Sequence, residues 1–585
     1  MPAKKEFYPH EGSVYKARTT PDPHQTQGLA KLARRPKTPS DEDVFAYVME
    51  MGTGKSREVL VDWQKLVGEE KLDDLMVVAP AGSYRNWFED KSSEQLSELK
   101  THLDPVLLKK AVVAPWVTGG GRAMRQRIQY MLDTTDRPRI FIVNCEAVST
   151  VEIVPKLMRE FLARGRAMFA IDESTLMRNG KADRTKIIIK LRELAAARRI
   201  MTGLISPKSP FDLYWQYYFL DPAILGFESP IGFRERYAVI EKQCFMPNNL
   251  IRDRLLKSMG IRNKDSALSD VLLKKKLAIV RAAVGGNTKV SAIPRADVIR
   301  KLQEEAAIMP RAKMVDVIPK LGGYVQTISK VKEFRNLDEL HKKTEPYSFR
   351  VLKKDVLNLP PKIFLPPRMV ELTSEQRRLY EEMKANATAE IEAEAHVTAT
   401  TVITRMIRLH QIVCGHVVDE EGVIHDVKSN RISAIQEILA EHSGKAIIWS
   451  TYRHEIEKIA AALRKEYGEE STAMYYGGNK GTRAQDERRF IGDPACRFMV
   501  STQAAGGRGN TWVVADLVIY AANNHDLELR LQSEDRPHRR GQTKSVVYAD
   551  LQSPGTVEQP IVRALRKKID MATIINGENY LEWLI

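Results

Sequence analysis

The sequence predicts an α/β protein with two doubly wound, parallel-sheet lobes, and a mostly helical basic insertion and a linker between them. Short apolar runs alternate with helical patterns in both halves of the chain, which is typical of parallel sheets covered by helices. The strand patterns stop between about residues 232 and 343, where the insertion is expected. With 585 residues the chain is too long for one core, and its length favours about three or four domains.

Composition limits the partners. The net charge of +16 favours a polyanion, most often nucleic acid, although an anionic membrane surface fits the charge equally well. Apolar runs stay well short of the roughly 20 residues that span a bilayer, and the N-terminus has no signal-peptide core. The four cysteines lie far apart, which argues against a zinc knuckle or a disulfide framework and fits a reducing cytosol. We expect a soluble, intracellular protein associated with nucleic acid.

The first lobe contains a candidate phosphate loop. An apolar run at residues 44–48 leads into Met49-Glu50-Met51-Gly52-Thr53-Gly54-Lys55-Ser56, and a helical pattern follows. Glycines let the backbone wrap a phosphate, while Lys55 would reach the outer phosphates and Ser56 would hold Mg²⁺. The generic pattern has glycine where this chain has Met49, and a simple helix-capping turn is the alternative. The motifs downstream favour the phosphate loop.

Later strands of this lobe end on polar residues. The run at residues 167–171 stops at Asp172-Glu173, and the run at 199–201 stops at Thr202-Gly203. Ligands gather at the carboxyl ends of parallel strands, so Asp172 is expected to hold Mg²⁺ and Glu173 to orient or deprotonate water. An isolated Asp-Glu pair is more often a solvated turn, but the phosphate loop upstream reverses that preference. Gln25 opens a predicted helix, and its amide suits the edge of adenine.

The second lobe repeats the strand–helix pattern, with strands at residues 445–450, 498–502 and 515–520, but it has no phosphate-loop lysine. One lobe would therefore bind nucleotide and the other would complete the site. The candidate completing segment is Gln532-Ser533-Glu534-Asp535-Arg536-Pro537-His538-Arg539-Arg540-Gly541-Gln542. Guanidinium groups can meet γ-phosphate oxygens as charge develops, although a basic run alone is usually a solvated surface.

Taken in their order along the chain, the motifs of the first lobe resemble those of a superfamily-two helicase motor. Residues 532–542 are similar to the Swi/Snf family of DNA translocases. The resemblance implies two RecA-like lobes, ATP and Mg²⁺ as cofactors, and arginine fingers at Arg536 and Arg539. Arg540 stands where the family usually has an apolar residue. The implied catalytic residues are Lys55, Asp172, Glu173, Arg536 and Arg539. The implied nucleotide-binding residues are Gln25, Met51, Gly52, Thr53, Gly54, Lys55 and Ser56, with Ser56 and Asp172 at Mg²⁺. The implied coupling residues are Thr202, Gly203, Gly506, Gly507, Gly509 and Gln532.

The middle of the chain is the candidate DNA contact. Residues 245–330 hold seventeen Lys and Arg against seven Asp and Glu, and most of these charges could simply be solvated. The excess as a whole favours phosphate contacts that release counterions. Candidate DNA-binding residues are Lys274, Lys275, Lys276, Arg350, Lys353 and Thr451.

The predicted organisation has five parts: a polar leader (1–20), the first lobe (21–230), the basic insertion (231–345), a linker with a helical protrusion (346–430), and the second lobe with a closing helix (431–585). The expected function is ATP-dependent translocation on double-stranded DNA, with forked or single-stranded DNA as further candidate partners. The alternatives are a strand-separating, fork-regressing or annealing helicase, and a nucleic-acid-binding scaffold with a degenerate motor. A compact motor is typical of a phage or bacterium, which predicts the bacterial or infected-host cytoplasm, or the nucleus if the source is eukaryotic.

Overall fold

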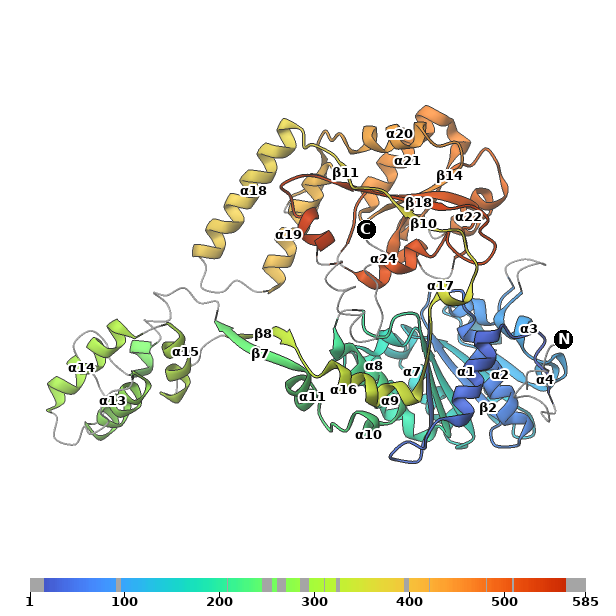
Figure 1. Cartoon of the computed structure of the whole chain (residues 1–585), viewed down its shortest axis with the longest axis horizontal. Coiled ribbons are helices and arrows are strands. Elements are labelled where there is room, and N and C mark those ends of the chain that lie inside the picture. Colours follow the sequence, from blue (N-terminus) through green and yellow to red (C-terminus); the bar gives the residue numbers. More distant parts are fainter. Residues whose placement is uncertain are drawn as a thin grey trace, which may run out of the picture. The chain divides into compact units, whose positions relative to one another are not determined.

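The computed structural model (Figure 1) describes residues 15–90, 96–207, 209–244, 255–259, 270–284, 294–309, 311–321, 327–393, 399–419, 421–479, 481–507, 510–524, 526–563 and 565. The chain divides into two compact units. One unit comprises Met1–Tyr237, Asn336–Gln376 and His410–Ile585, and it contains both large sheets. The other comprises Ala238–Arg335 and Arg377–Leu409.

The first lobe is built on a parallel sheet in which seven strands are described, in the order β3-β4-β2-β5-β6-β1-β9. The strands are β1 (Asp43–Met49), β2 (Asp74–Ala79), β3 (Val112–Pro115), β4 (Arg139–Asn144), β5 (Ala167–Asp172), β6 (Ala197–Thr202) and β9 (Ser348–Val351). β1 lies between β6 and β9, and β5 lies between β2 and β6. This order brings the carboxyl ends of β1, β5 and β6 together at one edge, where ligands of such sheets collect.

Two apolar cores cover the two faces of this sheet. Along β1, Val44, Ala46 and Val48 belong to one core, whereas Phe45, Tyr47 and Met49 belong to the other. This alternation follows from the two-residue period of a strand that is buried on both sides. Residues of α2 (Lys55–Gly68) and α1 (Pro23–Arg34) pack on the second face, and those of α5 (Gly121–Asp133), α7 (Ile153–Leu162), α8 (Asp183–Leu191) and α9 (Leu213–Leu220) on the first.

The second lobe is also a parallel sheet, with described strands in the order β10-β18-β17-β14-β16-β15 and β11 paired to β18. These strands are β10 (Lys362–Phe364), β11 (Arg368–Met369), β14 (Lys445–Ser450), β15 (Thr472–Tyr475), β16 (Phe498–Thr502), β17 (Ala515–Tyr520) and β18 (Val546–Gln552). Along β14, Ala446 and Ile448 join one core, and Ile447 and Trp449 join the other. The predicted fold class, two α/β lobes built on parallel sheets, is confirmed.

The segment between the lobes contributes strands to both sheets. β9 pairs with β1 of the first lobe, while β10 and β11 pair with β18 of the second. Sequence patterns treat residues 346–430 as a linker, because strands of two to four residues are too short to show a period. The five-part division of the chain stays a prediction, and these pairings show which lobe each strand joins.

The second compact unit is mostly helical. It contains α13 (Asp270–Val284), α14 (Arg295–Ile308) and α15 (Arg311–Lys320), which share a core that includes Leu277, Leu302 and Val317. β7 (Ala238–Cys244) and β8 (Thr327–Phe334) form an antiparallel pair. The sequence did not predict these two strands. The strands are far apart in the sequence, and no short turn joins them that would indicate a hairpin.

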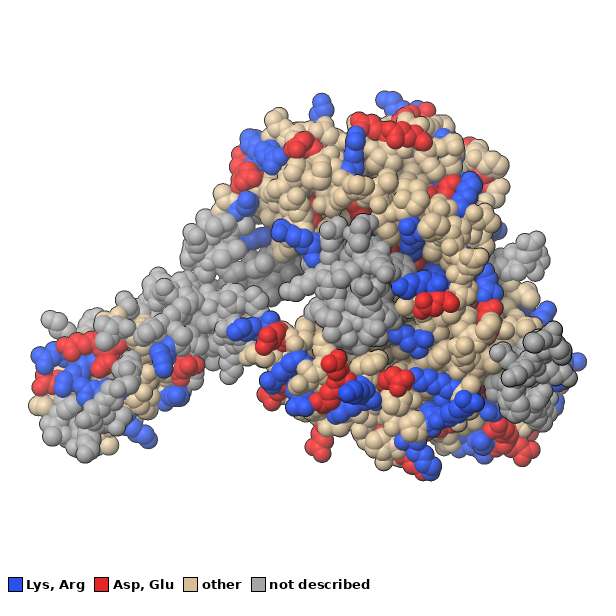
Figure 2. All heavy atoms as spheres, viewed as in Figure 1, with Lys and Arg blue, Asp and Glu red and all other residues tan. Residues whose placement is uncertain are grey.

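Charge is interspersed on the described surface. Figure 2 shows Lys and Arg mixed with Asp and Glu over the face in view, and no continuous basic band crosses the described part of that face. The excess of positive charge over the chain therefore does not by itself locate a nucleic-acid contact there. Among the described residues, no helix combines the length and apolarity needed to cross a membrane.

Candidate nucleotide site

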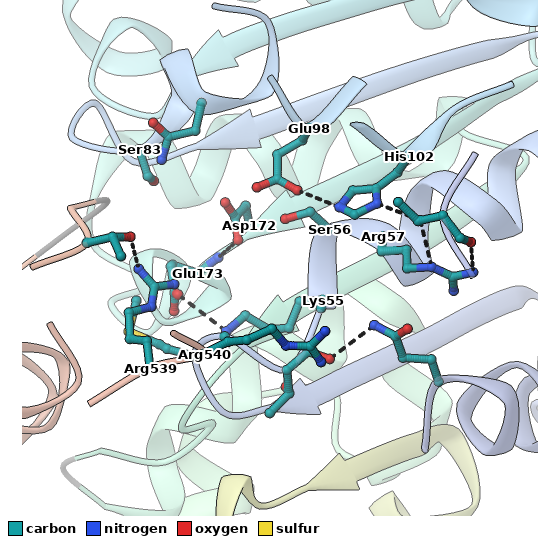
Figure 3. A pocket seen from close by; sticks show the side chains of 18 of the residues that line it. Lys55, Ser56, Arg57, Ser83, Glu98, His102, Asp172, Glu173, Arg539 and Arg540 are labelled. Atoms are coloured by element: carbon teal, nitrogen blue, oxygen red, sulfur yellow. Dashed lines mark hydrogen bonds and ion pairs between the residues drawn. The ribbon is translucent and has the colours of Figure 1, made fainter. Parts of the chain in front are cut away.

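A cavity of about 580 Å³ is lined by residues from both lobes. Its lining includes all of the predicted catalytic and nucleotide-binding residues, together with the coupling candidate Gln532. Figure 3 shows Lys55, Asp172, Glu173 and Arg539 turned toward one another around this space. These side chains come from the start of α2, from the end of β5 and the residue after it, and from the segment after α24 (Leu527–Glu534), so only the fold brings them together.

The phosphate loop connects β1 to the N-terminus of α2. Its glycines Gly52 and Gly54 have φ of 83° and 93°, left-handed values that other residues rarely adopt. A Cβ added to Gly54 would lie 2.0 Å from Nε2 of Gln25, so any larger residue would displace that side chain. The first N–H groups of α2 have no carbonyl partners within the helix, and the helix dipole is positive at this end. Both features favour binding of an anion.

Gln25 braces this loop. Its side chain is buried, its Oε1 accepts from the Asp22 N–H at 2.8 Å, and its Nε2 donates to the Thr53 carbonyl at 3.3 Å. The amide therefore joins the start of α1 to the phosphate loop. An amide has capacity for further hydrogen bonds beyond these two, so Gln25 could still bind adenine. Adenine recognition by Gln25 stays a prediction.

The charged centre of the cavity holds one ammonium and two carboxylates. Lys55 Nζ donates to the Met49 carbonyl at 3.0 Å and lies 3.8 Å from a Glu173 oxygen. Burial and the neighbouring Glu173 charge raise the pKa of Asp172 to about 7. Ser56 and Asp172 both line the cavity, and their hydroxyl and carboxylate oxygens are donors that Mg²⁺ prefers. The residues present thus fit a magnesium–nucleotide ligand.

Glu173 adopts a strained backbone conformation. Its φ of 48° and ψ of 63° are left-handed, and for a non-glycine residue such a conformation must be held by its surroundings. Ser174 Oγ donates to Gln216 Oε1 at 2.6 Å, which ties the next residue to α9. Strained residues cluster at functional sites, and this one carries the carboxylate predicted to act on water.

The two predicted finger arginines approach from the second lobe. Arg536 is fully buried, and it donates to the carbonyls of Gln532 and Asn510 at 2.8 and 2.7 Å. Its Nη2 lies 2.8 Å from Met51 Sδ, in the phosphate loop. Arg539 donates to the Asn510 carbonyl at 3.0 Å and to Thr511 Oγ1 at 2.9 Å. Burial and the charge of Arg539 lower the pKa of Arg536 to about 9, so an added anion would relieve this pair of cations.

The surroundings of Lys353 differ from those expected of a residue that contacts DNA. It is buried, its ammonium donates to the His538 carbonyl at 3.0 Å, and it lies 2.7 Å from Asp535 Oδ1. Lys362 lies 3.3 Å from the same carboxylate oxygen. These lysines hold the pKa of Asp535 well below its usual range. Lys353 therefore holds the arginine segment in place, and an ammonium already engaged in a buried pair is poorly placed to reach a DNA phosphate.

The coupling candidates lie mostly outside the cavity. Thr202 ends β6, and its hydroxyl donates to the Leu204 carbonyl at 3.1 Å, which shapes the turn at Gly203. A Cβ on Gly506 would lie 2.3 Å from Ser501 Oγ, and one on Gly507 would lie 2.2 Å from the Gln503 carbonyl. Packing alone therefore accounts for both glycines. Gly509 lies outside the described residues, and the coupling role of all these positions stays a prediction.

The remaining DNA candidates are scattered. Arg350 is half-buried on β9, and Thr451 is half-buried just after β14. On α13, Lys275 is exposed and Lys274 is half-buried, while the Lys276 ammonium donates to the Ser258 carbonyl. The two groups belong to different compact units, so each stays a separate prediction of DNA contact.

Several site residues escaped the sequence patterns. Trp87 donates to Asp172 Oδ2 at 3.3 Å, and Thr511 contacts Arg539. Trp87 could have been found, because β2 pairs with β5 and the segment after β2 must therefore lie beside Asp172. Asn510 and Thr511 carry no recognisable pattern. Their contacts depend on how the loop after β16 folds.

A second cluster of ligand-type residues brings together the predicted linker segment and the second lobe. His410, Cys414 and Glu558 place three ligand atoms within 4.8 Å of one another. Arg431, however, donates to both Glu558 oxygens at 2.9 Å, and burial raises the pKa of the Cys414 thiol well above its usual range. A protonated thiol and a carboxylate engaged by arginine are poor metal ligands. These residues therefore fit a packing role better than a metal site.

Known proteins share parts of this chain. Residues 430–541 match the helicase conserved C-terminal domain. Over 264 residues the chain is 24% identical to an uncharacterized ATP-dependent helicase of Mycoplasma genitalium, covering 44% of this chain and 25% of that protein. Over 296 residues it is 25% identical to the TATA-binding protein-associated factor MOT1 of Saccharomyces cerevisiae, covering 42% of this chain and 16% of that protein.

Two further similarities complete the comparison. The chain is 28% identical over 254 residues to a chromatin structure-remodeling complex subunit of Schizosaccharomyces pombe, covering 40% of this chain and 21% of that subunit. A solved structure, the Sulfolobus solfataricus SWI2/SNF2 ATPase core in complex with double-stranded DNA, aligns over 98% of this chain and 96% of that one, with 19% identity and a TM-score of 0.34. The chain spans about a quarter or less of the length of these three sequence relatives. The chain is thus similar to ATP-dependent helicases and chromatin-remodeling proteins, and the matched helicase C-terminal domain includes Arg536 and Arg539.

Proposed function

We propose that this protein is a motor that hydrolyses ATP and translocates on double-stranded DNA. The observation that carries the proposal is the shared cavity, in which Lys55, Asp172 and Glu173 of one lobe face Arg536 and Arg539 of the other. A site that is completed only when two lobes approach can convert each round of hydrolysis into a movement of one lobe against the other.

Each residue has a role that its chemistry suits. Gly52 to Ser56 would cradle the phosphates, and Lys55 would neutralise the outer ones. Mg²⁺, when bound, would neutralise phosphate charge, with Ser56 and Asp172 as its protein ligands. Glu173 would orient and deprotonate the attacking water. Arg536 and Arg539 would stabilise the charge that develops on the γ-phosphate oxygens.

We propose that the motor moves along DNA because of the proteins that the chain resembles and because of its net positive charge. The named relatives include a chromatin-remodeling subunit and a TATA-binding protein-associated factor, and the chain carries a net charge of +16. We propose that the basic residues 245–330 contribute phosphate contacts. Deleting them should weaken DNA binding and flatten the slope of log K against log salt, since fewer counterions are released. An unchanged slope would show that the insertion makes no contacts with DNA phosphates.

The deciding experiment compares ATPase rates with double-stranded, single-stranded and forked DNA and with RNA, in parallel. The expected result is the largest stimulation by double-stranded DNA. Displacement of a triplex-forming strand without unwinding of the duplex would support translocation, whereas splitting of a forked duplex would establish the helicase alternative. Binding of DNA with no hydrolysis under any condition would leave the scaffold alternative.

A further inference from the structure

Helix α24 of the second lobe begins where it meets the first lobe. Leu527, at its first position, is fully buried in a cluster with Leu204 of the first lobe and with Ile561 and Leu565 of the second. Leu204 follows the Thr202-Gly203 turn, and its N–H is 3.3 Å from Thr202 Oγ1. The start of α24 is therefore docked on a turn whose shape is set in the first lobe.

The next residue, Glu528, forms the polar part of this junction. Its Oε1 accepts from Thr175 Oγ1 at 2.9 Å, and its Oε2 accepts from Arg178 Nη1 at 2.9 Å. Both partners belong to the first lobe. Oε1 also accepts from Gln532 Nε2 at 3.2 Å, within the second lobe. With 6% of its surface exposed, this carboxylate is a buried charge that bridges the lobes.

The surroundings suit a carboxylate at this position. Asp526 caps α24 by accepting from the N–H of Glu528 at 3.0 Å, which places Glu528 in the first helical turn. Negative charge is favourable there because the helix dipole is positive at that end. Arg178 supplies the opposite charge that a buried carboxylate requires.

On the first-lobe side, Glu528 holds the segment that follows Glu173. Glu173 has the left-handed backbone described above, and Ser174 is tied to α9 through Gln216. Thr175 is tied to Glu528 instead. The strained residue is thus followed by one anchor within its own lobe and one that exists only while the lobes are docked.

On the second-lobe side, Glu528 contacts Gln532, which in turn contacts Arg536. Gln532 lines the nucleotide cavity, and its carbonyl accepts from Nε of Arg536 at 2.8 Å. Hydrogen bonds therefore run from Thr175 to Glu528, from Gln532 to Glu528, and from Arg536 to Gln532. One carboxylate organises both the residue predicted to act on water and the residue predicted to act on phosphate.

We propose that Glu528 is a positioning residue that couples lobe docking to hydrolysis. It lies outside the lining of the cavity, and it acts through Thr175 on Glu173 and through Gln532 on Arg536. When the lobes separate, Glu528 leaves Thr175 and Arg178, and Glu173 loses one of the supports of its conformation. This inference rests on the proposed ATPase function and assigns a residue of the junction to its regulation.

The test measures DNA-stimulated ATP hydrolysis and nucleotide affinity separately. Glu528→Ala removes the hydrogen bonds with Thr175, Arg178 and Gln532, and it should lower kcat on the order of 10- to 100-fold, the range expected for lost hydrogen bonds to a charged group. The Kd for a fluorescent ATP analogue should change by no more than about threefold, since Glu528 is not expected to touch nucleotide. Glu528→Gln keeps an acceptor oxygen for Thr175 but loses the charge facing Arg178, and it should lie between Glu528→Ala and the wild-type protein.

A double-mutant cycle separates positioning from general loss of stability. If Thr175→Val acts through the same contact, adding it to Glu528→Ala should lower kcat little further than Glu528→Ala alone. Asp516→Asn makes the same carboxylate-to-amide change as Glu528→Gln, at a half-buried pair with His442 and Lys544 at the start of β17. That control should leave kcat, the nucleotide Kd and DNA stimulation unchanged.

The outcomes separate the two proposals. Wild-type hydrolysis with kcat unchanged in both Glu528 variants would overturn the positioning role alone. A raised nucleotide Kd with normal kcat, or additive effects of Thr175→Val and Glu528→Ala, would also overturn it. Absence of hydrolysis in the wild-type protein with every nucleic acid would overturn the ATPase function and the positioning role together.

Discussion

The two lobes share an architecture and differ at the turn after one strand. In the first lobe, β1 ends in a glycine turn that leads to Lys55 at the start of α2. In the second, β14 leads through Thr451 and Tyr452 into α21 (Arg453–Tyr467), with no glycine and no lysine in the turn. Of these two turns, the one after β1 has the glycines and lysine of the predicted phosphate loop, and the one after β14 has neither. The second lobe contributes the two predicted finger arginines from the segment after α24, so the comparison shows that the two lobes contribute different groups to the cavity.

Removing the lysine of the first lobe should have the largest effect. Lys55→Ala takes away the ammonium that we propose contacts the outer phosphates, and we expect ATP turnover to fall by about 10³-fold or more. A steady-state ATPase assay with saturating DNA measures this. Lys65→Ala, in the same helix but with its side chain in a half-exposed pair with Glu69, should be close to wild type. Substantial hydrolysis by Lys55→Ala would mean that the lobes do not divide the work as proposed.

Removing an arginine of the second lobe should have the next largest effect. Arg539→Ala should lower kcat by about 10³-fold, as for an arginine finger, while the affinity for nucleotide changes little. Single-turnover hydrolysis and equilibrium binding of a fluorescent analogue measure the two quantities. Arg368→Ala removes an arginine from an exposed pair with Glu437 and serves as the control. A loss of binding that matches the loss of rate would show that Arg539 holds ground-state nucleotide rather than the transition state.

Acid should destabilise the second lobe through two buried histidines. Burial lowers the pKa values of His416 and His538 to about 4. Between about pH 6.5 and pH 4 the unfolded chain binds protons that the folded protein excludes, so the free energy of unfolding falls as the pH is lowered through this window. Calorimetric scans at pH 7 and pH 5 measure the change in Tm. His538→Gln should show a smaller drop in Tm than wild type, and an equal drop would show that His538 is not the group responsible.

The smallest effect is expected at an exposed ion pair between the lobes. Arg540 pairs with Asp22 across the mouth of the cavity, with 63% of the Arg540 side chain exposed. Such pairs contribute about 0–1 kcal/mol, so Arg540→Ala should change kcat and KM for ATP by about threefold or less. Kinetics at two salt concentrations check this, because screening should reduce the difference. A tenfold rise in KM would instead assign Arg540 a direct contact with nucleotide.

Local patterns predicted the scaffold and most of the cavity. β1 and β5 are recognisable because strands buried on both faces read as apolar runs, and ligands collect where such strands end. The residues at those ends, Lys55 and Asp172, were predicted for that reason, and the resemblance of residues 532–542 to a family supplied the arginines. β9, β10 and the β7–β8 pair were missed, since a strand of three or four residues, or one paired to a distant partner, has no signal of its own.

The sequence by itself determined which residues are candidates for phosphate binding, metal binding and charge stabilisation, and which of them follow a predicted strand or open a predicted helix. Tertiary structure alone decided that Lys353 is engaged by Asp535 and that Glu528 joins Thr175 to Gln532. The physical reason is one of range. A periodic pattern reports which face of a strand or helix is buried, because burial repeats along the element. A hydrogen bond between two lobes depends on the relative position of segments several hundred residues apart, and no local repeat records it.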